Sequence, residues 1–268
     1  MLSAVIIIPA LNEEASVADV VRAIPRAPAG ARVDRVIVVD NGSTDGTARA
    51  ARAAGADVVG EPARGYGRAC LAGIVEIASG PTPDVVVFLD GDRSDRPEDL
   101  PHVLAPIVRG EADLVIGSRV LGARAGRIER GALLPQARVG NWLATKLLHA
   151  RWGVRFTDLG PFRAIRYADM LRLGMSDPTY GWTVEMQARA ARAGLRCAEV
   201  PVGYRRRVGR SKISGTLSGS LRAGAKILLT IGRLALRPAR AGAAREAGEA
   251  GTIFAEAERP APISPTPQ

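Results

Sequence analysis

The chain has 268 residues, 47% of them hydrophobic, and a formal net charge of +10. This hydrophobic fraction excludes a chain that is disordered throughout, and aromatic residues, at 4%, are too few to favour a stacking platform for nucleic acid. The length fits one large α/β domain or two small ones. The charge leaves three classes of partner: nucleic acid, an anionic membrane and a phosphorylated substrate.

Short apolar runs alternate with helical patterns over residues 1–118. Strands are expected at residues 5–9, 36–39, 56–59, 85–89 and 114–116. Helices are expected after Asn12, which could cap the first of them, at residues 47–54 and 98–109, and from a loop at residues 64–67 to about residue 78. This alternation predicts a parallel sheet with helices on both faces. In open sheets of this kind, ligands bind beyond the carboxyl ends of the strands.

Residues 120–135 are rich in Gly and Arg, which predicts a long loop that carries function. The pattern beyond it predicts helices at residues 136–150, 182–193 and 218–236, and strands at residues 162–165 and within 196–206. Residues 237–268 are dominated by Ala, Gly, Glu and Pro, a composition typical of a disordered tail. We therefore expect one α/β domain at residues 1–236, divided into residues 1–119, 120–213 and a terminal amphipathic helix at 214–236.

The sequence also points to a compartment. Cys70 and Cys197 are too few for a disulfide framework and stand in no metal-binding spacing, so a reducing cytoplasm is expected. The N-terminus has no basic region followed by a cleavage site, which disfavours a signal peptide. No stretch approaches the ~20 uninterrupted apolar residues of a membrane span.

Asp90 and Asp92 carry the sharpest chemical signal in the sequence. An apolar strand delivers these two carboxylates, separated by Gly91, into a turn. Such a pair can hold Mg²⁺ or Mn²⁺, and the ion can bind a diphosphate leaving group. The alternative is a hairpin turn or a helix cap, but the polar residues that follow do not form the second apolar strand that a hairpin requires.

A second polar cluster, residues 40–46, follows the strand at residues 36–39. The Asp40 carboxylate could accept a hydrogen bond from a base or a ribose hydroxyl, and the helix that begins after the cluster favours anions at its N-terminus. The alternative is a plain connection between a strand and a helix. The position of Asp40 one strand end from Asp90 favours the binding interpretation.

Two nucleotide-binding signatures are missing from the sequence. Residues 9–14, directly after the first expected strand, do not form a G-x-G-x-x-G motif. No G-x-x-x-x-G-K-[ST] loop occurs either. Dinucleotide-dependent oxidoreductases and P-loop NTPases are therefore disfavoured.

Four motifs follow one another in order, at residues 8–14 (IPALNEE), 39–47 (VDNGSTDGT), 89–92 (LDGD) and 117–119 (GSR). Together they resemble the nucleotide-sugar half of a family 2 glycosyltransferase of GT-A fold. Residues 180–187 and 207–212 resemble the branch of this family that contains dolichyl-phosphate and polyprenyl-phosphate sugar synthases. The resemblance covers residues 4–235.

The resemblance implies a UDP-sugar or GDP-sugar donor, a polyprenyl-phosphate acceptor and transfer with inversion. It also implies a donor pocket formed by Pro9, Ala10, Asn12, Glu13, Asp40, Ser43, Asp45, Arg64, Gly67, Asp90 and Gly91. Asp92 would be the principal ligand of Mg²⁺ or Mn²⁺, with Asp90 beside it. The implied ligands of the diphosphate or of an acceptor phosphate are Arg207, Arg210 and Lys212.

The resemblance places Arg119 against the donor sugar or its phosphate. A hydroxyl acceptor needs a general base, for which Glu185 is the first candidate and Asp158 the second. A polyprenyl phosphate is already anionic and needs none. The alternative for Glu185 is a carboxylate that only stabilises the first turn of a helix. The family often has a glutamine shortly after the aspartate pair, where this chain has Ser94 and Asp95.

The positive charge is concentrated at residues 204–240, which contain ten basic and no acidic residues. Arg222, Lys226, Arg233 and Arg237 fall on one side of the last expected helix, beside an apolar surface. This pattern predicts contact of residues 214–237 with an anionic membrane and a peripheral location at its inner face. The alternative is a helix packed on the domain with its charges in solvent.

Three other functions compete with this interpretation. A glycosyltransferase could act on a soluble hydroxyl acceptor instead. A sugar nucleotidyltransferase also uses a mononucleotide pocket and a carboxylate-bound metal, but usually has a Gly-rich basic loop after the first strand, which is absent here. A nucleic-acid-binding protein would explain the charge, but two acidic clusters at strand ends repel phosphate, so no nucleic acid is expected.

Overall fold

The structure, a computed structural model, describes residues 1–28, 30–208, 217–236 and 253–254. In this part of the chain one sheet has the strand order β3-β2-β1-β4-β6-β5-β7-β8. The strands are β1 (Leu2–Ala10), β2 (Ala31–Asp40), β3 (Asp57–Gly60), β4 (Val85–Phe88), β5 (Leu114–Ser118), β6 (Arg163–Arg166), β7 (Cys197–Pro201) and β8 (Ile253–Phe254). Only β6 runs antiparallel to its neighbours, so the expected mostly parallel α/β sheet is confirmed.

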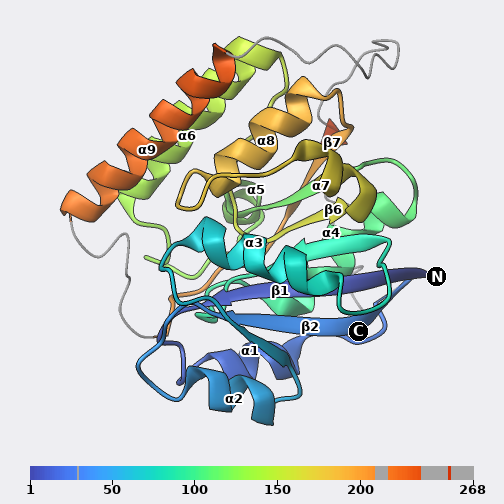
Figure 1. The fold of residues 1–268 in the computed structure, drawn as a ribbon. Helices are drawn as coiled ribbons and strands as arrows, with labels where there is room; N and C mark the ends of the chain where they lie inside the picture. Colours follow the sequence, from blue (N-terminus) through green and yellow to red (C-terminus); the bar gives the residue numbers. More distant parts are fainter. Residues whose placement is uncertain (29, 209–216, 237–252, 255–268) are drawn as a thin grey trace, which may run out of the picture.

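Buried β-branched runs form the central strands because both faces of the sheet are covered. The side chains of a strand alternate between the two faces. Ile6 and Ile8 therefore enter one core with α1 (Val17–Ala23) and α4 (Leu100–Val108), while Val5 and Ile7 enter the other with α3 (Tyr66–Ile77) and α8 (Trp182–Arg192). Figure 1 shows α1 and α3 on opposite sides of β1 and β2.

The remaining helices complete the two layers. They are α2 (Thr47–Ala53), the 3-10 turn η1 (Pro97–Asp99), α5 (Arg119–Arg124), α6 (Pro135–Trp152), α7 (Tyr167–Leu173) and α9 (Leu217–Ala235). Helices α6 and α9 run alongside each other, outside α8, at the edge of the molecule farthest from α1 and α2 (Figure 1). Within the described residues, no helix combines the length and apolar character needed to cross a bilayer.

The structure corrects two expectations for the elements. Asn12 does not cap the first helix, which begins only at Val17, because its side chain instead accepts a hydrogen bond from the Thr44 amide at 2.8 Å. The expected loop at 120–135 opens with α5, whose first turn is capped by the Ser118 hydroxyl. Of the one or two strands expected within residues 196–206, the structure has one, β7, and Tyr204 makes only isolated bridges.

Two elements were not expected from the sequence. Helix α7 follows β6 directly, and β8, two residues long, pairs with β7 inside the expected tail. The rest of residues 237–268 lies outside the described residues, as do Arg210 and Lys212. The division of the chain at residue 236 therefore stays a prediction.

Candidate active site

The carboxyl ends of β1, β2 and β4 meet at one edge of the sheet, because these strands are parallel neighbours. A cavity of about 550 Å³ opens at this edge. Eight of the residues implied by the sequence line it: Pro9, Ala10, Glu13, Arg64, Asp90, Gly91, Asp92 and Arg207. Leu11, Asn41, Gly65, Tyr66, Ala69, Thr179 and Tyr180 also line it and were not expected. The structure thus brings together chain segments that are up to 198 residues apart, from Pro9 to Arg207.

Three carboxylates crowd the edge of this cavity. Asp92 is buried and accepts hydrogen bonds from the Ser94 amide at 2.8 Å and the Ser94 hydroxyl at 2.5 Å. Burial and the neighbouring Asp92 charge raise the pKa of Asp90 to about 7. Asp95 accepts the Asp90 amide at 3.3 Å, and its other carboxylate oxygen is buried without a hydrogen-bond partner. Burial and the charges of Asp90 and Asp92 raise the pKa of Asp95 well above its ordinary range, so the three carboxyls do not readily carry charge together without a cation.

Arg207 partly balances these carboxylates. Its guanidinium lies 3.1 Å from Glu13 and 3.2 Å from Asp92. The backbone brings it there, because the Val208 amide donates to the Asp92 carbonyl and the Arg205 amide to the Ser94 carbonyl. The resemblance implied that Arg207 binds either the donor diphosphate or an acceptor phosphate. The structure places it on the first cavity.

The turn after β2 lies behind the first cavity and supports it. Asp40 accepts the Ser43 amide at 3.0 Å, and the Ser43 hydroxyl accepts the Asn12 amide at 2.9 Å. Asp45 accepts the Thr47 amide at 3.0 Å. The bond between Ser43 and Asn12 joins the loop after β2 to the loop after β1. None of the cavity's lining residues is Asp40, Ser43, Asp45 or Asn12.

Asn41, which directly follows Asp40, was missed from the sequence. Its amide donates to the carbonyls of Glu61 and Ala63 at 2.9 Å, and its oxygen accepts the Gly65 amide at 2.7 Å. These three bonds hold the loop that carries Arg64 against the cavity. A polar residue next to a strand-end aspartate was the only available signal.

Gly67 has a packing role, since it does not line the cavity. A Cβ atom at this position would collide with the Asp177 carbonyl. The start of α3 therefore packs closely on residues 177–178, where the Arg68 amide donates to the Pro178 carbonyl at 3.0 Å. This contact holds the loop that brings Thr179 and Tyr180 to the cavity.

Arg119 and Asp158 form a buried pair beside the first cavity. The Asp158 oxygens accept from Nε and Nη2 of Arg119, and from its backbone amide, at 2.8 Å each. The guanidinium also lies 5.2 Å from the centre of the Tyr204 ring. Burial raises the pKa of Asp90, and the positive charge of Arg119 lowers it by a smaller amount. Arg119 is therefore close enough to interact electrostatically with Asp90.

The segment that carries Asp158 is itself fixed from behind. Glu199 on β7 accepts the amides of Thr157 at 2.8 Å and Asp158 at 3.0 Å, and burial raises the pKa of Glu199 to about 7. Gln187 on α8 donates to the Asp158 carbonyl at 2.9 Å. Asp158 is thus held as a positioning partner of Arg119, a geometry that does not favour the general base considered from the sequence.

Glu185 is likewise engaged in the fold. It lies in the first turn of α8, is buried, and accepts the amides of Ser176 at 3.1 Å and Asp177 at 2.7 Å. Its carboxylate also pairs with Arg189 at 2.7 Å. Glu185 lines neither cavity described here. This geometry fits a carboxylate that stabilises the first turn of a helix better than it fits a general base.

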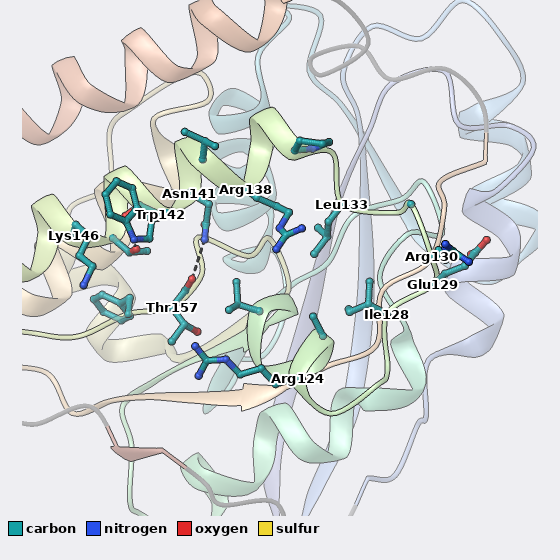
Figure 2. A pocket seen from close by; sticks show the side chains of 17 residues that line it. Arg124, Ile128, Glu129, Arg130, Leu133, Arg138, Asn141, Trp142, Lys146 and Thr157 are labelled. Atoms are coloured by element: carbon teal, nitrogen blue, oxygen red, sulfur yellow. Dashed lines mark hydrogen bonds between the residues drawn. The ribbon is translucent and has the colours of Figure 1, made fainter.

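A second cavity of about 1100 Å³ lies between α5, α6 and residues 128–133. Figure 2 shows Arg124 and Arg138 extending into it, with Lys146 and Trp142 along α6. Four basic side chains line it, including Arg130, against one acidic side chain, Glu129.

The second cavity adjoins the Arg119–Asp158 pair. Asn141 on α6 donates to the Thr157 carbonyl at 2.8 Å, and the hydroxyls of Thr157 and Ser118 lie 2.7 Å apart. Each of these hydroxyl residues directly precedes one member of the pair. The pair therefore lies beside both cavities.

Comparison with known proteins identifies the family. The model of glycosyl transferase family 2 matches residues 5–170. The chain belongs to this family. Its expected GT-A fold and glycosyltransferase class are confirmed. An uncharacterized glycosyltransferase of Mycobacterium tuberculosis is 40% identical over 218 residues, which cover 81% of this chain and 92% of the relative.

Two further relatives bear on the branch of the family. The undecaprenyl-phosphate mannosyltransferase of Micrococcus luteus is 35% identical, over 69% of this chain and 77% of the relative. The dolichyl-phosphate hexose transferase of Haloferax volcanii is 32% identical, over 78% of this chain and 86% of the relative. The expected likeness to polyprenyl-phosphate sugar synthases is confirmed.

Among solved structures, glucosyl-3-phosphoglycerate synthase from Mycobacterium tuberculosis, in complex with Mn²⁺, UDP and phosphoglyceric acid, has a similar fold. Its TM-score is 0.66 at 26% identity, over 88% of this chain and 80% of that chain.

Proposed function

We propose that this glycosyltransferase moves a sugar from a UDP- or GDP-sugar to a polyprenyl phosphate with inversion. The observation that carries the proposal is the placement of two cavities beside Arg119. The first has the carboxylates of Asp90 and Asp92, and the second combines four basic side chains with apolar walls. A donor diphosphate suits the first cavity, and an acceptor with an anionic head and an apolar body suits the second.

Asp90 and Asp92 fit a divalent cation, either Mg²⁺ or Mn²⁺. Within the described residues, no three His, Cys, Asp or Glu side chains are grouped to hold a metal alone. Two carboxylates and the donor diphosphate are nevertheless a usual ligand set for Mg²⁺. Asp95, with one buried oxygen that has no hydrogen-bond partner, belongs to the same cluster, in which a cation would favour the charged form of the carboxylates. When bound, the cation would neutralise charge on the departing diphosphate. The Mn²⁺ in the similar synthase supports this assignment.

The protein's own groups would act on the diphosphate and the acceptor. Arg207 and Arg119 supply fixed positive charge where negative charge grows as the glycosidic bond to the diphosphate breaks. Asp158 keeps Arg119 oriented. Both carboxylates considered as general bases, Asp158 and Glu185, are held by an arginine. This arrangement supports an acceptor that is already anionic.

The second cavity could also take a small phosphorylated acceptor. The similar synthase was solved with phosphoglyceric acid, and the four basic side chains would suit such a molecule. The apolar lining, which includes Trp142 and Phe156, favours a lipid phosphate instead. With a lipid acceptor, the enzyme would work at the inner face of the membrane as a peripheral protein.

A transfer assay tests the proposal. The protein would be incubated with UDP- or GDP-sugars labelled in the sugar, Mn²⁺, and either polyprenyl phosphate or 3-phosphoglycerate. We expect label in the organic extract only with polyprenyl phosphate, and no transfer by Asp92→Asn. Label in a water-soluble product formed with 3-phosphoglycerate alone would overturn the lipid acceptor. No transfer from any donor would overturn the whole proposal.

A further inference from the structure

Helix α6 has an apolar stripe that is exposed in the part of the chain that the structure describes. Val139 is 65% exposed and Trp142 is 59% exposed, followed by Leu143 at 39% and Leu147 at 36%. Their spacing of three, four and eight residues from Val139 places them on one side of the helix. The opposite side packs inward through Ala144, Thr145 and Leu148.

The described part of α9, which contacts α6, also exposes apolar side chains. Leu229 is 70% exposed and Leu228 is 40% exposed, while Ile231 and Leu234 are buried. The sequence had predicted that basic residues of this helix face the membrane. Lys226, however, pairs with Asp177 at 3.1 Å. Arg222 and Arg237 are outside the side chains that the structure describes.

The charge of these two helices fits an anionic surface. The sequence of α6 contains Arg138, Lys146 and Arg151 and no acidic residue, and α9 also has no acidic residue. Lys146 and Arg138 are both exposed. By helical spacing, Lys146 lies within the apolar stripe, between Trp142 and Val139, and Arg138 lies at its border. Helices with an apolar face, a tryptophan and flanking basic residues lie in the interface of anionic bilayers.

The stripe is continuous with the second cavity. Val139 and Trp142 belong to the stripe and also line the cavity, as Figure 2 shows for Trp142. A bilayer in contact with the stripe would therefore meet the mouth of this cavity.

We propose that Val139, Trp142, Leu143 and Leu147 of α6, with Leu228 and Leu229 of α9, form a surface that docks on an anionic bilayer. This docking surface lets a lipid head group reach the second cavity without leaving the membrane. The docking itself is independent of the proposed function. Only the delivery of a lipid acceptor rests on it.

Vesicle co-sedimentation of the full chain, without any acceptor, tests the docking surface. The vesicles contain phosphatidylcholine alone or with phosphatidylglycerol. The test variant is Leu143→Gln with Leu229→Gln, neither of which lines a cavity. The matched control is Val75→Gln with Leu171→Gln, on α3 and α7, where the side chains are 73% and 53% exposed. Circular dichroism verifies that each variant is folded.

We expect the wild type and the control to sediment with anionic vesicles, less with neutral ones, and less at high salt. The test variant should bind anionic vesicles about tenfold more weakly or worse, because two leucines no longer enter the bilayer. No sedimentation of the wild type, or equal binding by test and control variants, would overturn the proposal. The proposal would also be overturned if the wild type did not bind vesicles but formed a dimer in solution, and if the test variant were a monomer. Vesicle binding without sugar transfer would leave the docking surface intact and refute the proposed function alone.

Discussion

The carboxylate of Asp158 holds the guanidinium of Arg119 through both of its oxygens, at 2.8 Å each. Asp158 is 1% exposed, and its own backbone is fixed by Glu199 and Gln187. A carboxylate held in this way is a poor proton acceptor for a substrate but a good anchor for a cation. The pair thus explains how Arg119 can keep one position between the two cavities.

If Asp158 acts through Arg119, changing either residue should have similar consequences. We expect Asp158→Asn and Arg119→Lys each to lower kcat by about 100-fold, because about 3 kcal/mol of oriented charge is lost. The double variant should be little worse than either single one, since one interaction is lost in all three. Steady-state kinetics on all four proteins measure this coupling. Effects that multiply, or the loss of one limb of the pH profile in Asp158→Asn alone, would indicate an independent base.

Glu185 should matter more for the position of the loop that carries Thr179 and Tyr180 than for proton transfer. Glu185→Gln removes the charge that pairs with Arg189 and weakens the bonds to the Ser176 and Asp177 amides. We expect the free energy of unfolding to fall by about 1–3 kcal/mol. We also expect the KM for the nucleotide-sugar to rise more than kcat falls. Denaturant titration and kinetics test both. A kcat lowered by about 1000-fold or more at unchanged stability would instead support a general base.

Glu199 should make stability depend on pH. Its pKa in the fold is about 7, above the ordinary value of 4.5, because burial disfavours the charged form. The folded state then binds more protons than the unfolded state between these values, so this group's contribution falls as pH rises from 4.5 to about 7.

The comparison that isolates this effect is Glu199→Gln, which cannot ionise. The difference in unfolding free energy between wild type and variant should shift against the wild type by about 3 kcal/mol from pH 4.5 to 8. Urea denaturation at a series of pH values measures it. A difference that stays constant over this range would mean that Glu199 does not titrate there.

Gly67 should tolerate no side chain. Its missing Cβ lets α3 approach the Asp177 carbonyl, so Gly67→Ala must move the loop that carries Thr179 and Tyr180. We expect a loss of about 1–3 kcal/mol in stability and weaker nucleotide binding. The matched control is Gly60→Ala on the edge strand β3, where nothing lies within 4 Å of the added atom. Equal stability and equal nucleotide affinity for the two variants would contradict the packing role.

The sequence was informative where one element carries the whole signal. The β-branched runs of β1, β2 and β4 reveal buried strands, and their order places Asp40 and Asp90 at one edge. It was less informative where contacts join distant segments. Nothing local to Arg207 shows that residues 205–208 fold back onto residues 92–94.

The partner of Asp158 could not be predicted for the same reason, because the arginine that holds it is 39 residues away. The arginine that holds Glu185 is only 4 residues away on the same helix, so this pair could have been predicted and was missed. The second cavity was also hidden, because it depends on how α6 packs over the turn that carries Thr157. Basic residues lie within and next to the exposed stripe of α6, so apolar and polar residues are not clearly separated in the sequence of this helix.

The central claim is that Asp90 and Asp92 make the first cavity a metal-dependent site for a nucleoside diphosphate. Titration calorimetry with UDP and GDP, with and without Mn²⁺, on wild type and Asp92→Asn tests it most directly. We predict that Mn²⁺ strengthens binding of one nucleotide to the wild type by about tenfold or more, and that Asp92→Asn abolishes this gain. Equal nucleotide affinity with and without Mn²⁺ in the wild type, or an undiminished gain in Asp92→Asn, would contradict the claim.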